Sequence, residues 1–301
     1  MNPLSEGAQR ARLLKLATTA SVATASLLVA AKLGAWLLTG SVSLLASLVD
    51  SLMDVFASAV NLAAVRWSLL PPDDEHRFGH GKAEALAGLG QAAFIAGSAL
   101  FLVFHVVERL LNPKPLEHLG VGLGIMAFSM VATALLILFQ RYVIRRTASL
   151  AIRSDSLHYL SDLLTNAGIL LALGLALYGW GWADPVIGLA VAGYILWSAV
   201  RIGLDGVNML MDRELPAEDQ ARILEIASRP PEALGVHDLR TRQSGATRFI
   251  QLHLELPADL RLADSHAIVA QVEADLQAAF PAADVMIHQD PVGRKAPPVS
   301  G

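Results

Sequence analysis

Apolar residues run almost without interruption from residue 13 to residue 210, and six stretches are long enough to cross a bilayer. We place them at residues 13–38, 42–66, 83–110, 118–142, 149–178 and 184–208. A membrane-spanning helix needs about 20 mostly apolar residues. The first stretch is too long for the core of a signal peptide, and more spans follow it. The pattern predicts a polytopic α-helical membrane domain of six helices over residues 13–210, after a short cytoplasmic segment over residues 1–12.

The pattern becomes that of a small soluble domain after residue 210. Helical spacing over 217–228 is followed by strand-like stretches over 236–242 and 248–256, then a helix near 263–280 and a strand at 284–290. In the second stretch apolar and polar residues alternate, which is typical of a half-buried strand. We therefore expect a metallochaperone-like α+β domain of order α-β-β-α-β over residues 211–291. The Pro/Gly/Ser-rich composition of residues 292–301 predicts a disordered tail.

Composition narrows the class of protein and the kind of site. Of the 301 residues, 54% are hydrophobic and only 17% are charged, whereas a soluble protein carries about 25% charged residues. The net charge of −4 argues against nucleic acid as a partner. Because the chain has no cysteine, any metal site must be built from His, Asp or Glu.

Basic residues predict the orientation in the membrane. Twelve Lys and Arg residues flank the spans on the side of the termini and two flank them on the other side, counting Arg10, Arg12, Lys15, Arg66, Arg77, Lys82, Arg141, Arg145, Arg146, Arg153, Arg201 and Arg213 against Arg109 and Lys114. Loops rich in Lys and Arg stay in the cytoplasm. Both termini are therefore expected there.

Two apolar stretches contain ionisable pairs that a membrane helix would normally exclude. Asp50 and Asp54 lie in the second stretch, and His158 and Asp162 lie in the fifth. Each pair is four residues apart, which places both side chains on one face of a helix. A charge at mid-membrane costs at least about 2.5–3.5 kcal/mol, so two such pairs favour function over a structural hydrogen-bonding role. Four His and Asp ligands form the set that a tetrahedral Zn²⁺ takes.

Two further groups are candidates for metal binding. The connector after the second stretch contains Asp73, His76 and His80, for which a three-ligand site and a solvated polar turn are equally compatible with the spacing. Scattered surface histidines are common, yet the small C-terminal domain holds four of the nine histidines in the chain. This enrichment favours a metal site built from His237, His253, His266, His288 and Asp290.

These motifs together resemble the cation diffusion facilitator family. The resemblance is carried by the two intramembrane pairs, by Phe78-Gly-His-Gly-Lys-Ala-Glu84, by Asp238-Leu-Arg-Thr-Arg-Gln-Ser-Gly245 and by Ile287-His-Gln-Asp-Pro291. It implies that the four intramembrane residues form the transport site and that the loop residues form a second site. It also implies a binuclear cytoplasmic site that helps to hold a homodimer, a charge interlock between Lys82 and Asp212, and a bacterial inner membrane as the location.

We therefore expect an efflux transporter for Zn²⁺ or Fe²⁺, with Cd²⁺ as a further substrate, that exchanges metal for protons and carries no prosthetic group. An intramembrane zinc hydrolase is disfavoured because the chain has no His-Glu-x-x-His motif and because four ligands would close the site to water. A metal-sensing receptor would leave the mid-membrane carboxylates without a purpose. A channel would need weaker binding than a closed tetrahedral site provides.

Overall fold

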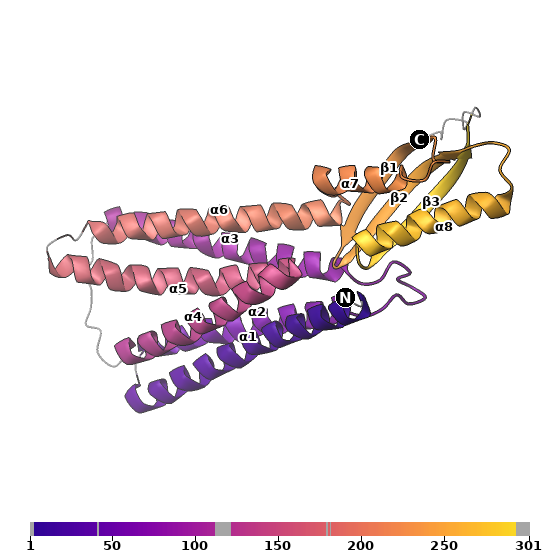
Figure 1. The fold of residues 1–301 in the computed structure, drawn as a ribbon. Coiled ribbons are helices and arrows are strands. Elements are labelled where there is room, and N and C mark those ends of the chain that lie inside the picture. The colour runs from indigo at the N-terminus through magenta and orange to yellow at the C-terminus, as the bar shows by residue number, and fades with distance from the viewer. Residues whose placement is uncertain (1–2, 41, 112–121, 179, 181, 293–301) are drawn as a thin grey trace. The chain divides into compact units, whose positions relative to one another are not determined.

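The computed structural model describes residues 3–40, 42–111, 122–178, 180 and 182–292. The chain forms two compact units, one comprising Ala8–Val207 and the other comprising Met1–Gly7 with Asn208–Gly301. Six long helices lie alongside one another (Figure 1): α1 (Pro3–Thr39), α2 (Val42–Ser68), α3 (Lys82–Leu111), α4 (Gly122–Thr147), α5 (Leu150–Leu177) and α6 (Ala183–Leu210). Each of the six predicted stretches corresponds to one of these helices.

The long helices have the character of a transmembrane region. Among the described residues, five of them, α1, α2, α3, α4 and α6, are long and apolar enough to cross a membrane. The sixth, α5, carries the ionisable residues Asp155, His158 and Asp162. Large apolar side chains point outward from the helices, such as Phe104, 73% exposed, and Leu138, 62% exposed. Outward apolar surface of this kind is expected where helices face lipid.

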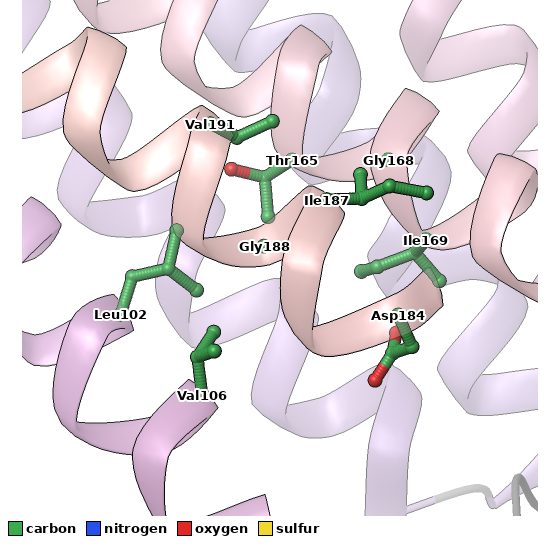
Figure 2. A pocket seen from close by; sticks show the side chains of 9 residues that line it. All are labelled: Leu102, Val106, Thr165, Gly168, Ile169, Asp184, Ile187, Gly188 and Val191. Carbon is green, nitrogen blue, oxygen red and sulfur yellow. The ribbon is translucent and has the colours of Figure 1, made fainter. Parts of the chain in front are cut away.

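Helix α5 occupies the middle of the bundle and packs against α2, α3 and α4. Gly168 on α5 and Gly188 on α6 lie among the residues that line a pocket between α3, α5 and α6 (Figure 2), and both sit close to neighbouring side chains. A Cβ atom added to Gly188 on α6 would lie 2.7 Å from Val106 Cγ2 on α3, and one added to Gly168 on α5 would lie 3.2 Å from Ile187 Cγ2 on α6. Such contacts are typical of membrane helices, where packing replaces the hydrophobic effect as the driving force.

The C-terminal unit is an α+β domain built from α7 (Ala217–Ala227), β1 (Gly235–Ser244), β2 (Thr247–Leu256), α8 (Leu262–Ala279) and β3 (Ala283–Pro291). The sheet order is β1-β2-β3, with β1 antiparallel and β3 parallel to the central strand β2. Alternating residues of β2, including Ile250, Leu252 and Leu254, are buried in a core with α7 and α8. The predicted order of elements is confirmed.

Two helices extend well beyond their predicted bounds. Helix α1 begins at Pro3 rather than at residue 13, and α4 continues to Thr147 rather than ending at residue 142. Hydropathy marks the apolar part of a helix, whereas the helix itself continues through polar residues until its backbone hydrogen bonding stops. At the C-terminus, Val292 still donates its backbone N–H to Leu256, and the rest of the predicted tail lies outside the described residues.

Candidate metal sites

Helices α2 and α5 meet through a row of polar contacts. The Asp54 Oδ1 atom lies 3.0 Å from His158 Nε2, Ser58 Oγ lies 2.8 Å from the Tyr159 hydroxyl, and Asn61 Nδ2 donates to the Ala151 carbonyl at 3.4 Å. From Asp54 to Asn61 the contacts on α5 move back from His158 to Ala151, so the two helices run in opposite directions. The Asp54–His158 contact places the two predicted ligand pairs at a similar level of the bundle.

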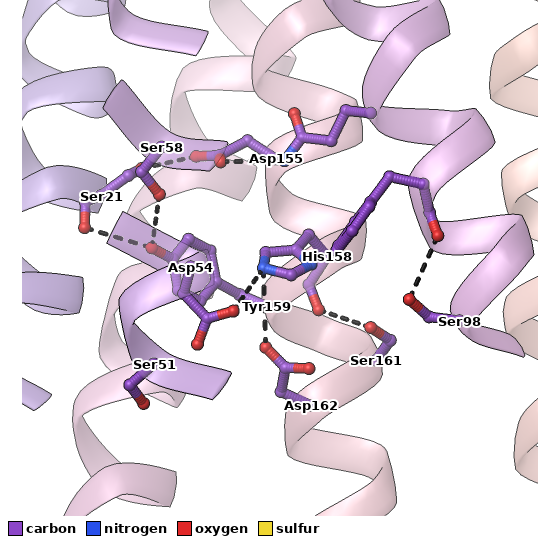
Figure 3. Close-up of polar contacts among 12 residues, drawn as sticks. Ser21, Ser51, Asp54, Ser58, Ser98, Asp155, His158, Tyr159, Ser161 and Asp162 are labelled. Carbon is purple, nitrogen blue, oxygen red and sulfur yellow. Dashed lines mark hydrogen bonds and ion pairs between the residues drawn. The ribbon is translucent and has the colours of Figure 1, made fainter. Parts of the chain in front are cut away.

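The structure brings three of the four predicted intramembrane residues together (Figure 3). Asp54, His158 and Asp162 each offer a ligand atom within 4.8 Å of the others, and His158 Nε2 is 3.9 Å from Asp162 Oδ2. Asp50 lies one turn of α2 away from Asp54 and is not part of this compact group of described residues. Since the helices are antiparallel, Asp50 and Asp162 lie on the same side of the Asp54–His158 contact.

Exposure changes steeply across this group. The His158 side chain is 7% exposed and that of Asp54 is 13% exposed, whereas that of Asp162 is 41% exposed. The Phe94 and Tyr159 rings contact the His158 imidazole edge-on, at centroid distances of 6.2 and 5.4 Å. The aromatic neighbours fix the ring of the histidine. The site is therefore closed around His158 and open at Asp162.

A buried polar network that the sequence did not predict lies one turn from His158 on α5. The Asp155 carboxylate has no exposed surface. It accepts hydrogen bonds from Ser21 Oγ on α1 at 2.6 Å, Gln140 Nε2 on α4 at 2.7 Å and Gln91 Nε2 on α3 at 3.2 Å. The Tyr159 hydroxyl also contacts the Ser21 carbonyl at 3.2 Å. Asp155 thus ties α5 to three other helices beside the site.

The loop residues Asp73, His76 and His80 form a second compact group, with ligand atoms within 4.8 Å of one another. Asp73 Oδ1 is 3.3 Å from His76 Nδ1, and Asp73 Oδ2 is 3.2 Å from His80 Nε2. The hydrogen bond from the His76 backbone N–H, at 2.6 Å, is the main cause that holds the pKa of Asp73 below its ordinary value. The buried Nδ1 of His80 has no hydrogen-bond partner among the described residues. This donor set fits a divalent metal ion.

The third group lies on one face of the C-terminal sheet. Strand register places His237, His253 and His288 side by side on β1, β2 and β3. Asp290 joins them, since its Oδ2 atom is 2.7 Å from His253 Nδ1 and 3.3 Å from His237 Nε2, and its Oδ1 atom is 3.3 Å from His288 Nε2. A row of imidazoles around one carboxylate suits Zn²⁺.

Two carboxylates near this third group were not predicted, and one predicted ligand, His266, lies outside the group. Glu255 Oε1 is 3.6 Å from His237 Nε2, and Asp238 Oδ2 is 3.8 Å from His253 Nε2. Strand alternation could have identified Glu255, which follows His253 by two positions. His266 lies exposed on α8 beside the buried Ser265 and is not brought into the group. Asp212 lies 3.5 Å from Arg242 within its own unit. The charge interlock between Asp212 and Lys82, which belongs to the other unit, stays a prediction.

Comparison with known proteins places the chain in a family. Residues 18–211 match the family model "Cation efflux transmembrane domain", and residues 215–292 match "Cation efflux protein, cytoplasmic domain". The Cation-efflux pump FieF of Salmonella schwarzengrund is 51% identical over 280 residues, which cover 93% of each chain, and that of Citrobacter koseri matches equally.

Two solved structures each match less than a third of this chain. A structure of the zinc form of CzrB is 35% identical over 29% of this chain and 99% of its own, with a TM-score of 0.26. The metal-bound C-terminal domain of the CzcD transporter from Thermotoga maritima is 22% identical over 26% of this chain and 93% of its own, also with a TM-score of 0.26. The two family models and the FieF relatives each match a large part of the chain and together cover nearly all of it. The protein therefore belongs to the cation diffusion facilitator family and is a cation efflux transporter of a bacterial membrane.

Proposed function

We propose that this transporter exports divalent metal ions in exchange for protons, with Zn²⁺, Fe²⁺ and Cd²⁺ as substrates and with Asp50, Asp54, His158 and Asp162 as the transport site. The observation that supports this most directly is the group of Asp54, His158 and Asp162 on two membrane helices. One imidazole among carboxylates suits Zn²⁺, Fe²⁺ and Cd²⁺ better than Mn²⁺, which favours all-oxygen sites.

The Asp54–His158 contact provides a reason for exchange. An ionised carboxylate can only accept a hydrogen bond, so the 3.0 Å contact requires a proton on His158 Nε2. A metal ligand must present a free electron pair, so the same nitrogen cannot hold that proton and a metal ion together. When the metal-free imidazole carries a proton on both ring nitrogens, metal loading from the cytoplasm releases one of them, and a proton from the opposite side then displaces the metal.

The C-terminal domain and the membrane orientation extend the proposal. The match to the cytoplasmic domain of cation efflux proteins supports a homodimer held partly by the C-terminal domains. Metal ions bound by His237, His253, His288 and Asp290 would stabilise those domains by bridging three strands. The excess of basic residues on the side of the termini supports an inner-membrane protein with both termini in the cytoplasm.

Metal flux in proteoliposomes with an imposed pH gradient tests the proposal. We expect Zn²⁺ flux that follows the proton gradient and is lost in Asp54→Ala. The matched control is Glu108→Ala, which removes an exposed carboxylate from α3 and should leave the flux unchanged. Flux independent of the gradient would indicate a channel, and full flux in Asp54→Ala would refute the assigned site.

A further inference from the structure

Helix α1 carries a lysine whose side chain turns toward the transport site. Lys32 Nζ donates to Ser51 Oγ at 2.6 Å and to the Ser47 carbonyl at 3.1 Å, both on α2. Ser51 is buried, follows Asp50 in the sequence and lies one turn from Asp54 on the same helix (Figure 3). The ammonium group is therefore held at two points beside the ligand-bearing face of α2.

A lysine in a membrane helix usually extends toward the nearer end of the helix, where its charge meets water. Lys32 instead reaches across to α2. It lies seven residues before the end of α1 at Thr39, and Ser51 lies nine residues after the beginning of α2 at Val42. At a rise of about 1.5 Å per residue, the ammonium therefore stays at the level of Asp50, well inside the nearer ends of both helices. Such a costly position indicates a use for the charge.

The charges at the site give that use. Asp50, Asp54 and Asp162 carry three negative charges when ionised, and His158 is neutral when it binds a metal. A divalent ion leaves one of these charges unbalanced, and the Lys32 ammonium supplies the missing positive charge. Both Asp50 and Asp162 lie within electrostatic range of Lys32, and in a site of low dielectric constant such charges interact strongly.

We propose that Lys32, held by Ser51 and Ser47, is a positioning residue of the transport site, whose fixed positive charge balances the third carboxylate when a divalent ion is bound and so sets the binding strength. The inference rests on the proposed transport function. By opposing the metal, the charge keeps binding weak enough for release, which every conducting or transporting site requires. A neutral side chain at this position leaves a site that binds metal more tightly and releases it more slowly.

The test measures Zn²⁺ flux in proteoliposomes, with an alkaline solution on the metal-supplying side so that protons compete little. We expect Lys32→Gln, which keeps a donor for Ser51 but loses the charge, to lower the KM for Zn²⁺ about tenfold, equivalent to about 1.4 kcal/mol, and to lower the maximal rate. Lys32→Arg keeps the charge and should resemble the wild type. Lys15→Gln removes the same charge from an exposed position on α1 and should change neither quantity.

An unchanged KM in Lys32→Gln, or equal changes in Lys32→Gln and Lys32→Arg, would overturn the inference. If Lys32→Gln does not fold, Ser51→Ala keeps the charge without its tether and should shift the KM in the same direction by a smaller factor; an unchanged KM there would also overturn it. Asp54→Ala is measured in parallel. Loss of flux in Asp54→Ala together with a wild-type KM in Lys32→Gln would leave the transport function standing and refute only the role of Lys32.

Discussion

The strongest prediction for stability concerns Asp155, the buried carboxylate that joins α5 to α1, α3 and α4. Replacing it with alanine removes the acceptor for Ser21, Gln91 and Gln140 at once. Ser21 Oγ can still donate to the Ala17 carbonyl at 3.1 Å, and Gln140 Nε2 can still donate to Ser21 Oγ at 3.0 Å. One N–H group each of Gln91 and Gln140 is left without its acceptor in the interior, where an unpaired polar group is costly.

The magnitude follows from the number of lost bonds. A hydrogen bond between membrane helices is worth about 0.6 kcal/mol on average and about 1.7 kcal/mol at most. We therefore expect Asp155→Ala to lower the free energy of unfolding by about 2–5 kcal/mol. Asp155→Asn keeps one oxygen, which can still accept from Ser21 and Gln140. Its new amide group faces the Gln91 amide, whose own oxygen is already used by the Ser154 hydroxyl at 3.2 Å. The cost should thus be that of one bond.

Reversible unfolding by SDS in mixed micelles measures these free energies. The matched control is Ser98→Ala, because the Ser98 hydroxyl donates to the Phe94 carbonyl of its own helix and its loss should cost less than about 0.5 kcal/mol. The reasoning is refuted if Asp155→Ala is as stable as the wild type, or if the alanine and asparagine variants lose the same free energy.

Three other predictions concern separate parts of the chain. Gly188→Ala places a methyl group against Val106 and should cost about 1–3 kcal/mol in the same SDS assay; a double variant with Val106→Ala should recover most of it, and no recovery would exclude the contact as the cause. Ser58→Ala and Tyr159→Phe should show a coupling of about 0.6–1.7 kcal/mol in a double-mutant cycle, and purely additive losses would contradict the α2–α5 bond. The pKa of Asp73 is lowered, so its carboxylate is ionised at every pH above the ordinary aspartate pKa of about 3.9. Asp73→Asn should therefore weaken zinc binding at the loop by the same factor at about pH 5 and about pH 7, as zinc titration can check; a factor that vanishes at the lower pH would refute this.

Much of the fold could be predicted because hydropathy and alternation report directly on burial. The α+β order followed from alternating apolar positions on β2, which the structure buries at Ile250, Leu252 and Leu254. Helix ends were less predictable. Arg145 and Arg146 end the apolar run of the fourth stretch, yet they belong to the last turn of α4, where positive charge favours the helix dipole.

The candidate site was partly predictable because spacing of four residues fixes which side chains share a helix face. Spacing does not fix how each helix is rotated toward its neighbours. For that reason the sequence could not show that Asp155 faces a buried network while Asp162 remains half-exposed. It also could not show that Lys32 turns toward α2, since a lysine near a helix end is normally expected at the interface. The available signal was that Asp155 and Lys32 are ionisable residues within apolar stretches.

The polar face of α2 carries both contacts that hold the helices together and a predicted metal ligand. Ser51, Asp54 and Ser58 recur at the three- and four-residue spacing of one helix face and contact Lys32, His158 and Tyr159 respectively. Only the middle contact joins two predicted metal ligands. A metal ion bound between Asp54 and His158 would replace that single hydrogen bond while its neighbours on either side persist. Metal binding can therefore change the charge of the α2–α5 interface without separating the two helices. Any movement that opens the site to the opposite side of the membrane must either break the Ser58–Tyr159 contact or move α2 and α5 together.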